Sequence, residues 1–549
     1  MNQPHDLRDC TVRLGGLRPC WGMTLVGGFM RQESESDEVE GDSSWSLESP
    51  GVDSPVESGP AAAEGSSVSR EAAKGVMWLT AQSWLARGGG LVTIVILTHL
   101  LAPEAFGLLA VASTLLTLTY VLSDLGLSTY VVQAATVDRR SLSTAFWVSN
   151  LGGVLLGLAI MIGASPLAAL LRVPESAPIL RAMTIIVILI SLTSVPLALL
   201  RRRMAFPLLA VQGSVSALVA QIAAILAALG GLGVWALVLQ LVVGQVIASV
   251  WIWVSARWRP TIEFSRTEFV VMARFGVKVV GTGLVTVGRA WAETGVIVAC
   301  LGVRDLGYLS IAQRLVQTAT ELSGSAILPV STVAFAKVKS SKERLRAAHS
   351  KATAVSQTIV TPIMVFLAVG APVLVPFLFG QEWTVSAQVA QLLAISAALS
   401  FGTSLDRGMF EGLGRPGRWF ALVTAVYSLS VALIFIAARY GLLVVAFAYV
   451  IISTIETLGR WTVVSRFLEV SVARTARPFL RIAPAAFAAA LAGAGSLWLL
   501  RDAPALVSLM VAGVLVLGVY VVLIRLIIPG TWTDLVGLLP GRRRTAPVA

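Results

Sequence analysis

Long apolar runs, most of them 20 residues or more, follow one another from about residue 75 to residue 528. An α-helix needs about 20 apolar residues to cross the hydrocarbon core of a bilayer. The alternation of apolar runs and short polar connections therefore predicts fourteen membrane-spanning helices. They are placed at residues 77–100, 105–133, 143–164, 178–200, 207–229, 233–256, 270–301, 305–333, 353–378, 386–411, 417–438, 441–465, 479–500 and 505–528.

A motif near residue 100 returns 200 positions later. LAPEAFGLLAVA at 101–112 aligns with LGVRDLGYLSIA at 301–312, and both copies lie between two long apolar runs. A repeated helical unit in a membrane chain is typical of transporters, in which two similar bundles enclose a central cavity. Both copies follow an odd-numbered span, so we expect the two repeats to run parallel.

Charge in the connections gives the expected orientation. Basic residues cluster after every second span, for example at 201–203 and 337–351, and are sparse in the other connections. Because cytoplasmic loops are enriched in Lys and Arg, both termini are predicted to be cytoplasmic, in the cytoplasmic (inner) membrane. Residues 337–351 are predicted to form a separate basic helix on the membrane surface.

The heavier polar breaks divide the chain into five parts. We expect a disordered acidic tail at 1–74, because residues 33–64 combine ten acidic residues with Ser, Gly and Pro and contain no basic residue. Six-helix lobes are predicted at 75–265 and 266–470. Two additional membrane helices follow at 471–530, and a basic cytoplasmic tail occupies 531–549.

Composition excludes several classes of protein. Charged residues make up 13% of the chain, against about 25% in soluble domains, and the net charge of +12 is explained by membrane topology rather than nucleic-acid binding. Three cysteines and three histidines show no metal or disulfide spacing. There is no nucleotide-binding P-loop and no catalytic set, so we expect neither a metal, nor a cofactor, nor enzymatic activity.

Polar residues inside the spans are the candidate functional residues, because a charge at the centre of a bilayer is costly. Spans 2 and 8 each carry a polar stripe at three- and four-residue steps, and span 7 carries two basic residues and an acid. Arg87 interrupts span 1 and has no acid within one helical turn. Asp406, Arg407 and Glu411 near the cytoplasmic end of span 10 are interpreted as interfacial. The stripes are Ser113, Thr117, Tyr120, Asp124 and Ser128; Ser310, Arg314, Gln317, Glu321 and Ser325; and Lys278, Arg289 and Glu293.

Six short motifs, in order along residues 75–465, resemble a known family. They are LAPEAFGL (101–108), SDLGLS (123–128), LSTAFW (142–147), RRMAF (202–206), WRP (258–260) and EGLGRP (411–416). Together they resemble the Wzx-type polysaccharide and oligosaccharide flippases of the multidrug/oligosaccharidyl-lipid/polysaccharide exporter superfamily. In span 7 the chain departs from the family's Arg-Asn-x-Asp pattern and reads Arg289-Ala-Trp-Ala-Glu293.

The resemblance implies an all-α integral membrane protein with two parallel six-helix lobes around a V-shaped cavity and two C-terminal helices. It implies flipping of lipid-linked oligosaccharide, carried on a polyprenyl pyrophosphate, by alternating access. Membrane lipids, a polysaccharide polymerase and glycosyltransferases are the expected partners, with no nucleic acid, and the protein is expected to be monomeric. The alternatives are a lipid II flippase, a drug/cation antiporter of the same superfamily, and a membrane polysaccharide polymerase.

Roles for individual residues follow from phosphate and sugar chemistry. Guanidinium groups bind phosphate through charge-assisted, bidentate hydrogen bonds, and aromatic rings can stack on sugar faces. Carboxylates in a low-dielectric cavity are candidates for proton or Na⁺ coupling. We therefore assign the headgroup phosphates to Arg87, Arg289, Arg314 and Lys278, sugar stacking to Trp84, Tyr120 and Trp291, and ion coupling to Asp124, Glu293 and Glu321.

Overall fold

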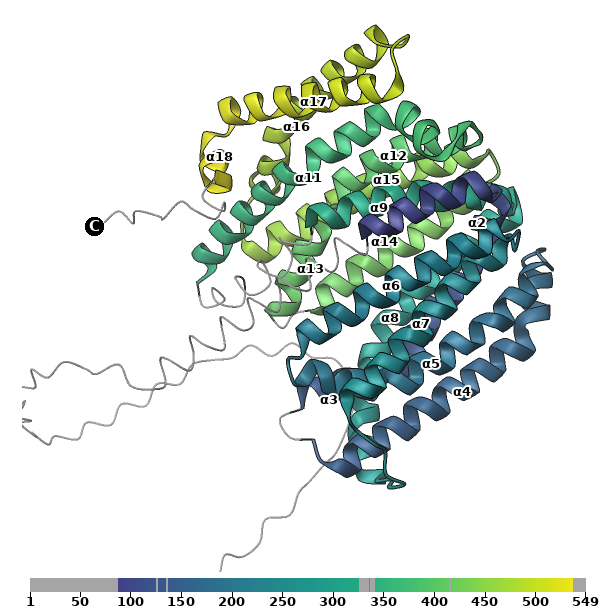
Figure 1. Cartoon of the computed structure of the whole chain (residues 1–549). Helices are drawn as coiled ribbons and strands as arrows, with labels where there is room; N and C mark the ends of the chain where they lie inside the picture. The colour runs from purple at the N-terminus through teal and green to yellow at the C-terminus, as the bar shows by residue number, and fades with distance from the viewer. Residues whose placement is uncertain are drawn as a thin grey trace, which may run out of the picture. The chain divides into compact units, whose positions relative to one another are not determined.

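The computed structural model describes residues 87–124, 127–134, 137–324, 335, 341–413 and 416–536. Within these residues every regular element is helical, as the sequence predicts, and most of the helices run side by side (Figure 1). All of them belong to one compact unit. The acidic tail at 1–74, the basic tail after residue 536 and Trp84 lie outside the described residues.

The helices of the first half follow the predicted spans closely. They are Arg87–Leu100, α2 (Pro103–Asp124), α3 (Leu127–Gln133), α4 (Arg139–Leu170), α5 (Ser176–Arg202), α6 (Phe206–Leu229) and α7 (Val234–Ala256). The second half contains α8 (Arg266–Leu301), α9 (Val303–Gly324), α11 (Lys342–Phe379), η1 (Gln381–Trp383), α12 (Thr384–Ser400), α13 (Thr403–Gly412), α14 (Pro416–Ala437) and α15 (Leu442–Leu468). The chain continues with α16 (Val472–Leu499), α17 (Ala505–Ile527) and α18 (Pro529–Val536).

Eleven helical segments among the described residues are long and apolar enough to cross a membrane. A multi-pass membrane protein is therefore confirmed, whereas fourteen spans remain a prediction. The three predicted spans outside the eleven are 77–100, 105–133 and 305–333. The first is described only from Arg87 onward, and the other two, represented by α2 and α9, are the spans in which the sequence places polar stripes.

Side-chain caps explain where four of the long helices begin. Asp138, Ser265, Ser341 and Ser471 each accept a hydrogen bond from a backbone N–H in the first turn of the helix that follows. Such caps satisfy backbone donors that have no partner inside the helix. All four caps lie in the basic connections, so the same short segments supply both topology signals and helix starts.

The predicted basic surface helix at 337–351 is wrong as a separate element. From Lys342 onward these residues form the first turns of α11, which continues without interruption to Phe379. Lys342 and Arg346 bind Glu469 at the end of α15, with nitrogen–oxygen distances of 2.5 and 3.7 Å, and hold the start of α11 against that helix. The hydrogen bond and charge of Lys342 lower the pKa of the Glu469 carboxyl below its usual value.

The predicted span at 386–411 is interrupted. It is divided into α12 and α13 at Phe401 and Gly402, although no proline lies between the two helices. A Cβ atom on Gly402 would overlap the guanidinium of Arg460 from α15. The glycine therefore leaves the space in which a buried arginine reaches the break, and a residue with a side chain there would displace it.

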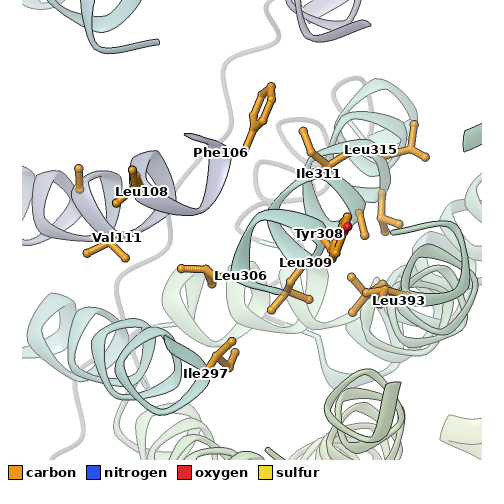
Figure 2. Close-up of a cluster of buried hydrophobic side chains, with 14 of the residues drawn as sticks. Phe106, Leu108, Val111, Ile297, Leu306, Tyr308, Leu309, Ile311, Leu315 and Leu393 are labelled. Atoms are coloured by element: carbon orange, nitrogen blue, oxygen red, sulfur yellow. The ribbon is translucent and has the colours of Figure 1, made fainter. Parts of the chain in front are cut away.

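Both copies of the 200-residue repeat begin a helix at the same position. Helix α2 begins at Pro103 and α9 begins at Val303, 200 residues apart. They pack against each other near their N-terminal ends, and residues of both helices, among them Phe106, Leu108, Leu306 and Leu309, belong to one buried hydrophobic cluster (Figure 2). The division into lobes at 75–265 and 266–470 stays a prediction.

The contact between α2 and α9 depends on glycine in both copies of the motif. A Cβ on Gly107 would overlap the carbonyl oxygen of Val303, and a Cβ on Gly307 would overlap that of Pro103. Since 303 and 103 also differ by 200, the two halves make the same contact with each other. We call this crossing of Gly107 and Gly307 the glycine contact.

Two further interactions join the same ends of these helices. Glu104 pairs with Arg304 at 3.3 Å. Trp383, which is fully buried, packs edge-on against Phe106 and Tyr308 and donates a hydrogen bond to the Thr98 carbonyl at 3.3 Å. Residues of both halves thus close this end of the helix pair.

Candidate functional site

The carboxylate of Glu321 on α9 forms an ion pair with Arg87. The Arg87 Nε atom lies 2.9 Å from Oε2 of Glu321, and an Nη atom donates to the Glu321 backbone carbonyl at 3.3 Å. Gln317, one turn earlier on α9, donates to the other carboxylate oxygen at 2.8 Å. The arginine that has no acid within one turn of its own helix is therefore paired with an acid 234 residues away.

A second ion pair lies within α8. The Nε atom of Arg289 is 3.1 Å from Oε1 of Glu293, one helical turn away, and its guanidinium lies over the ring of Tyr427, 4.4 Å from the centroid. The Glu293 side chain is only 8% exposed. It accepts hydrogen bonds from Ser430 at 2.5 Å and from the Tyr449 hydroxyl at 3.0 Å. A buried carboxylate needs such partners because its desolvation is costly.

One face of α9 connects the two ion pairs. Gln313, Gln317 and Glu321 follow at four-residue steps, which places them along one face of the helix. Gln313 faces the hydroxyl of Tyr449, which binds Glu293, and Glu321 holds Arg87 at the other end. We call Gln313, Gln317 and Glu321 the polar row.

Arg314 lies next to the polar row and is exposed. Within the described part of the chain its guanidinium makes no hydrogen bond or ion pair, and its carbonyl accepts from Thr318. Its guanidinium, unlike those of Arg87 and Arg289, is thus not engaged by a carboxylate.

Trp291 faces away from the Arg289–Glu293 pair. Its indole N–H donates to the Thr114 carbonyl of α2 at 3.1 Å, beside a small gap of about 40 Å³ between α2, α4, α5 and α8. Two residues along a helix turn the side-chain direction by about 200°, so Trp291 and Glu293 point to opposite faces of α8. The structure places Trp291 between helices, and sugar stacking by this residue stays a prediction.

Several predicted residues carry no description of their side chains. Tyr120 and Asp124 lie on α2 and Lys278 lies on α8, but the described side chains include none of the three, and Trp84 precedes the described residues. Their assigned roles therefore remain predictions from the sequence.

Tyr427, Ser430 and Tyr449 surround the Arg289–Glu293 pair but are absent from the sequence prediction. Ser430 and Tyr427 are three residues apart on α14, and Tyr449 lies on α15. The available signal was a pair of polar residues at helical spacing in an apolar span. That signal is weak because Ser bonds to its own helix backbone and Tyr occurs at membrane interfaces.

Asp406 is buried within the protein, and the interpretation of Asp406, Arg407 and Glu411 as interfacial stays a prediction. Asp406 binds His349 of α11 at 2.6 Å and Arg460 of α15 at 3.4 Å, and each of these three residues is at most 5% exposed. This buried cluster fixes α13 between two long helices. Among the described residues there is no group of three His, Cys, Asp or Glu side chains suited to a metal ion.

Helices long enough to span a membrane, with ionisable pairs among them, define a polytopic α-helical membrane protein. Residues 96–388 match the family described as "Polysaccharide biosynthesis protein". More than half of the chain is covered, so the protein belongs to this family.

Curated relatives agree with this placement, and a solved structure shows the fold. The chain is 29% identical to the succinoglycan biosynthesis transport protein ExoT of Rhizobium meliloti, over 61% of this chain and 68% of that protein. It is 23% identical to the lipopolysaccharide biosynthesis protein WzxC of Escherichia coli K12, over 59% and 66% of the two chains. The lipid II flippase MurJ, in an inward closed conformation, shares the fold with a TM-score of 0.68 at 15% identity, over 84% of this chain and 100% of that chain.

Proposed function

We propose that the protein flips lipid-linked oligosaccharide across the cytoplasmic membrane for the synthesis of a cell-surface polysaccharide. The observation that carries this proposal is the family match over residues 96–388. The relatives named for transport in succinoglycan biosynthesis and for lipopolysaccharide biosynthesis support it. A shared fold with the lipid II flippase supports a transporter rather than an enzyme.

The arginines beside the polar row supply the chemistry that the headgroup requires. A guanidinium group has five N–H donors, and Arg87 and Arg289 each use part of this capacity on a carboxylate. The pyrophosphate of the carrier binds the remaining donors of Arg87, Arg289 and Arg314, and Lys278 adds charge from α8. Glu321 and Glu293 hold two of the arginines in place when no lipid is bound.

Glu293 and Glu321 are also the proposed coupling residues. Glu293 is surrounded by the oxygens of Ser430 and Tyr449, and oxygen atoms are suitable neighbours for a proton or Na⁺. Asp124 keeps this role as a candidate on α2. In vesicles containing the purified protein, an imposed proton or Na⁺ gradient is expected to change the flipping rate, and a rate independent of both gradients contradicts the coupling.

Arginine variants test the headgroup site. Arg87→Ala, Arg289→Ala and Arg314→Ala are each expected to reduce flipping of a fluorescent polyprenyl-pyrophosphate oligosaccharide in vesicles at least tenfold, since each removes charge-assisted hydrogen bonds worth about 1.5–3 kcal/mol. Arg181→Ala is the matched control, because Arg181 is exposed on α5 and bonds only Ser165 among the described residues. Wild-type flipping in all three variants contradicts the site.

The antiporter alternative requires a different comparison. An unpaired arginine in the cavity would argue against a cationic substrate, but Arg87 is paired with Glu321 and therefore does not argue against an antiporter. A deletion strain distinguishes the first two alternatives. If the protein is an oligosaccharide flippase, its loss leaves lipid-linked sugar in the cytoplasmic leaflet, whereas loss of an antiporter changes only drug resistance. If it is a lipid II flippase, its expression rescues cells that have been depleted of lipid II flippase activity.

The finer topology belongs to the same proposal. We place both termini in the cytoplasm and the six-helix lobes at 75–265 and 266–470, with the helices at 471–530 attached to the second lobe. The protein acts as a monomer beside a polysaccharide polymerase and glycosyltransferases. Fluorescent-protein fusions after residues 260 and 549 are expected to fluoresce inside the cell, and loss of fluorescence at either position contradicts the orientation.

A further inference from the structure

A large basic cavity, separate from the polar row, lies between α11, α16 and the junction of α17 and α18. Its volume is about 880 Å³. It is lined by Ala347, Ser350, Lys351, Ala354, Arg474, Arg477, Pro478, Arg481, Ile527, Ile528, Pro529, Gly530, Thr531 and Thr533. The two C-terminal membrane helices therefore create, together with α11, a space that the first twelve predicted spans do not form by themselves.

The charges in this cavity have one sign. Arg474, Arg477 and Arg481 follow at steps of three and four residues and so share one face of α16, and Lys351 faces them from α11. None of the lining residues is acidic. Within the described part of the chain, none of the three guanidinium groups has a hydrogen-bond or ion-pair partner, so all three are available to an anion.

A smaller apolar cavity of about 170 Å³ begins one turn further along α11 and α17. Its walls are supplied by α11, α17 and Trp532 of α18. They consist of Thr358, Ile359, Pro362, Leu517, Tyr520, Val521, Ile524 and Trp532. Trp and Tyr favour the boundary between headgroups and hydrocarbon, and Trp532 and Tyr520 lie in the apolar cavity next to the basic one. The two linings therefore match a lipid molecule, which has a charged headgroup at one end and an apolar acyl chain at the other.

We propose that these adjoining cavities bind one anionic phospholipid, with its phosphate headgroup among Arg474, Arg477, Arg481 and Lys351 and an acyl chain beside Leu517 and Val521. Guanidinium groups match phosphate oxygens in geometry and charge. Basic pockets between membrane helices bind anionic headgroups in this way. The bound lipid connects α11 to α16 and α18 and is distinct from the transported lipid at the polar row.

Native mass spectrometry of the full-length protein tests this site. The protein is titrated with phosphatidylglycerol, and the variant R474Q/R477Q/R481Q is compared with R201Q/R344Q/R466Q, which removes the same charge at exposed positions outside the cavity. At about fivefold per charge near a membrane surface, removal of three charges is expected to weaken binding of the first lipid roughly 100-fold in the cavity variant. The control variant is expected to bind within about twofold of wild type.

A second variant identifies the source of the phosphate. Val521→Trp fills the apolar cavity and leaves the basic one intact, so it is expected to weaken phosphatidylglycerol binding without changing competition by soluble glycerol phosphate. Equal weakening in both charge variants, equal binding of phosphatidylcholine, or glycerol phosphate binding as tightly as the lipid overturns the proposal. Arg87→Ala is expected to keep wild-type phosphatidylglycerol binding, which separates this result from a failure of the flippase proposal.

Discussion

At the scale of single residues, Glu321 competes with any anion for Arg87. The ion pair is partly exposed, at 28% and 37% for the two side chains, so solvent screening limits its strength to about 1 kcal/mol. Glu321→Gln removes the competing charge and is expected to tighten binding of a polyprenyl-pyrophosphate analogue by up to about fivefold. Fluorescence titration measures this change. Gln317→Ala, which leaves the pair intact, is the control, and unchanged affinity in Glu321→Gln contradicts the competition.

The buried cluster of His349, Asp406 and Arg460 makes a separate prediction about stability. Asp406→Asn leaves the arginine buried without a counter-charge, which costs about 3–5 kcal/mol. The unfolding temperature of the detergent-purified protein is expected to fall, whereas Ser404→Ala, an exposed position on the same helix, is expected to leave it unchanged. Replacing Asp406 by Leu and Arg460 by Met together is expected to recover most of the loss, and no recovery contradicts an electrostatic cause.

Sequence distance decides which of these pairs could be predicted. Arg289 and Glu293 are one turn apart on a single helix, so their spacing predicts the pair that the structure contains. Arg87 and Glu321 are 234 residues apart, and His349 and Asp406 are 57 apart. No local pattern specifies such partners, because they depend on which helices pack together.

At the scale of elements, the glycine contact predicts the effect of a single methyl group. In Gly107→Ala or Gly307→Ala the new Cβ overlaps a backbone carbonyl, which cannot rotate away, so α2 and α9 must separate. Overpacking of this kind costs about 1–3 kcal/mol. Double electron–electron resonance between spin labels on α2 and α9 is expected to show a wider distance than in wild type.

Glycines with open surroundings supply the matched control for that measurement. A Cβ on Gly163 of α4 or Gly288 of α8 meets no atom within 4 Å. Gly163→Ala and Gly288→Ala therefore add the same methyl group to a helix without a clash. An unchanged distance in Gly107→Ala, or an equal change in the controls, contradicts a role of the contact in holding the helices together.

Apolar runs located most elements correctly, and the structure differs from them at two positions. Helix α11 begins at Lys342 after its cap Ser341, and its first turn binds Glu469; a hydropathy pattern includes neither contact. The span at 386–411 matches the apolar segment Gln381–Phe410, but its helix is broken at Phe401 and Gly402 without a proline, beside Arg460 of another helix. At both positions a contact from another helix lies where the apolar pattern and the helix bounds differ.

At the scale of the whole molecule, α2 and α9 must separate at their N-terminal ends if the cavity opens on that side. Glu104 and Arg304 are equivalent positions in the two copies and form an ion pair across the contact. Cysteines at these positions, joined by a short bifunctional thiol reagent, therefore hold α2 and α9 together. If alternating access requires this end to open, the cross-linked protein is expected to lose at least 90% of its flipping activity.

Chemical reversal makes this experiment decisive. Cys10, Cys20 and Cys300 are first replaced by Ser, because Cys300 is exposed and would react. Each single-cysteine variant reacts with the same reagent but cannot form a cross-link within the molecule. If the reagent is attached through disulfide bonds, a reductant cleaves those bonds and is expected to restore transport in the double-cysteine variant alone. Full transport with the cross-link in place contradicts opening at the glycine contact, and it would require the substrate to pass without separation of α2 from α9.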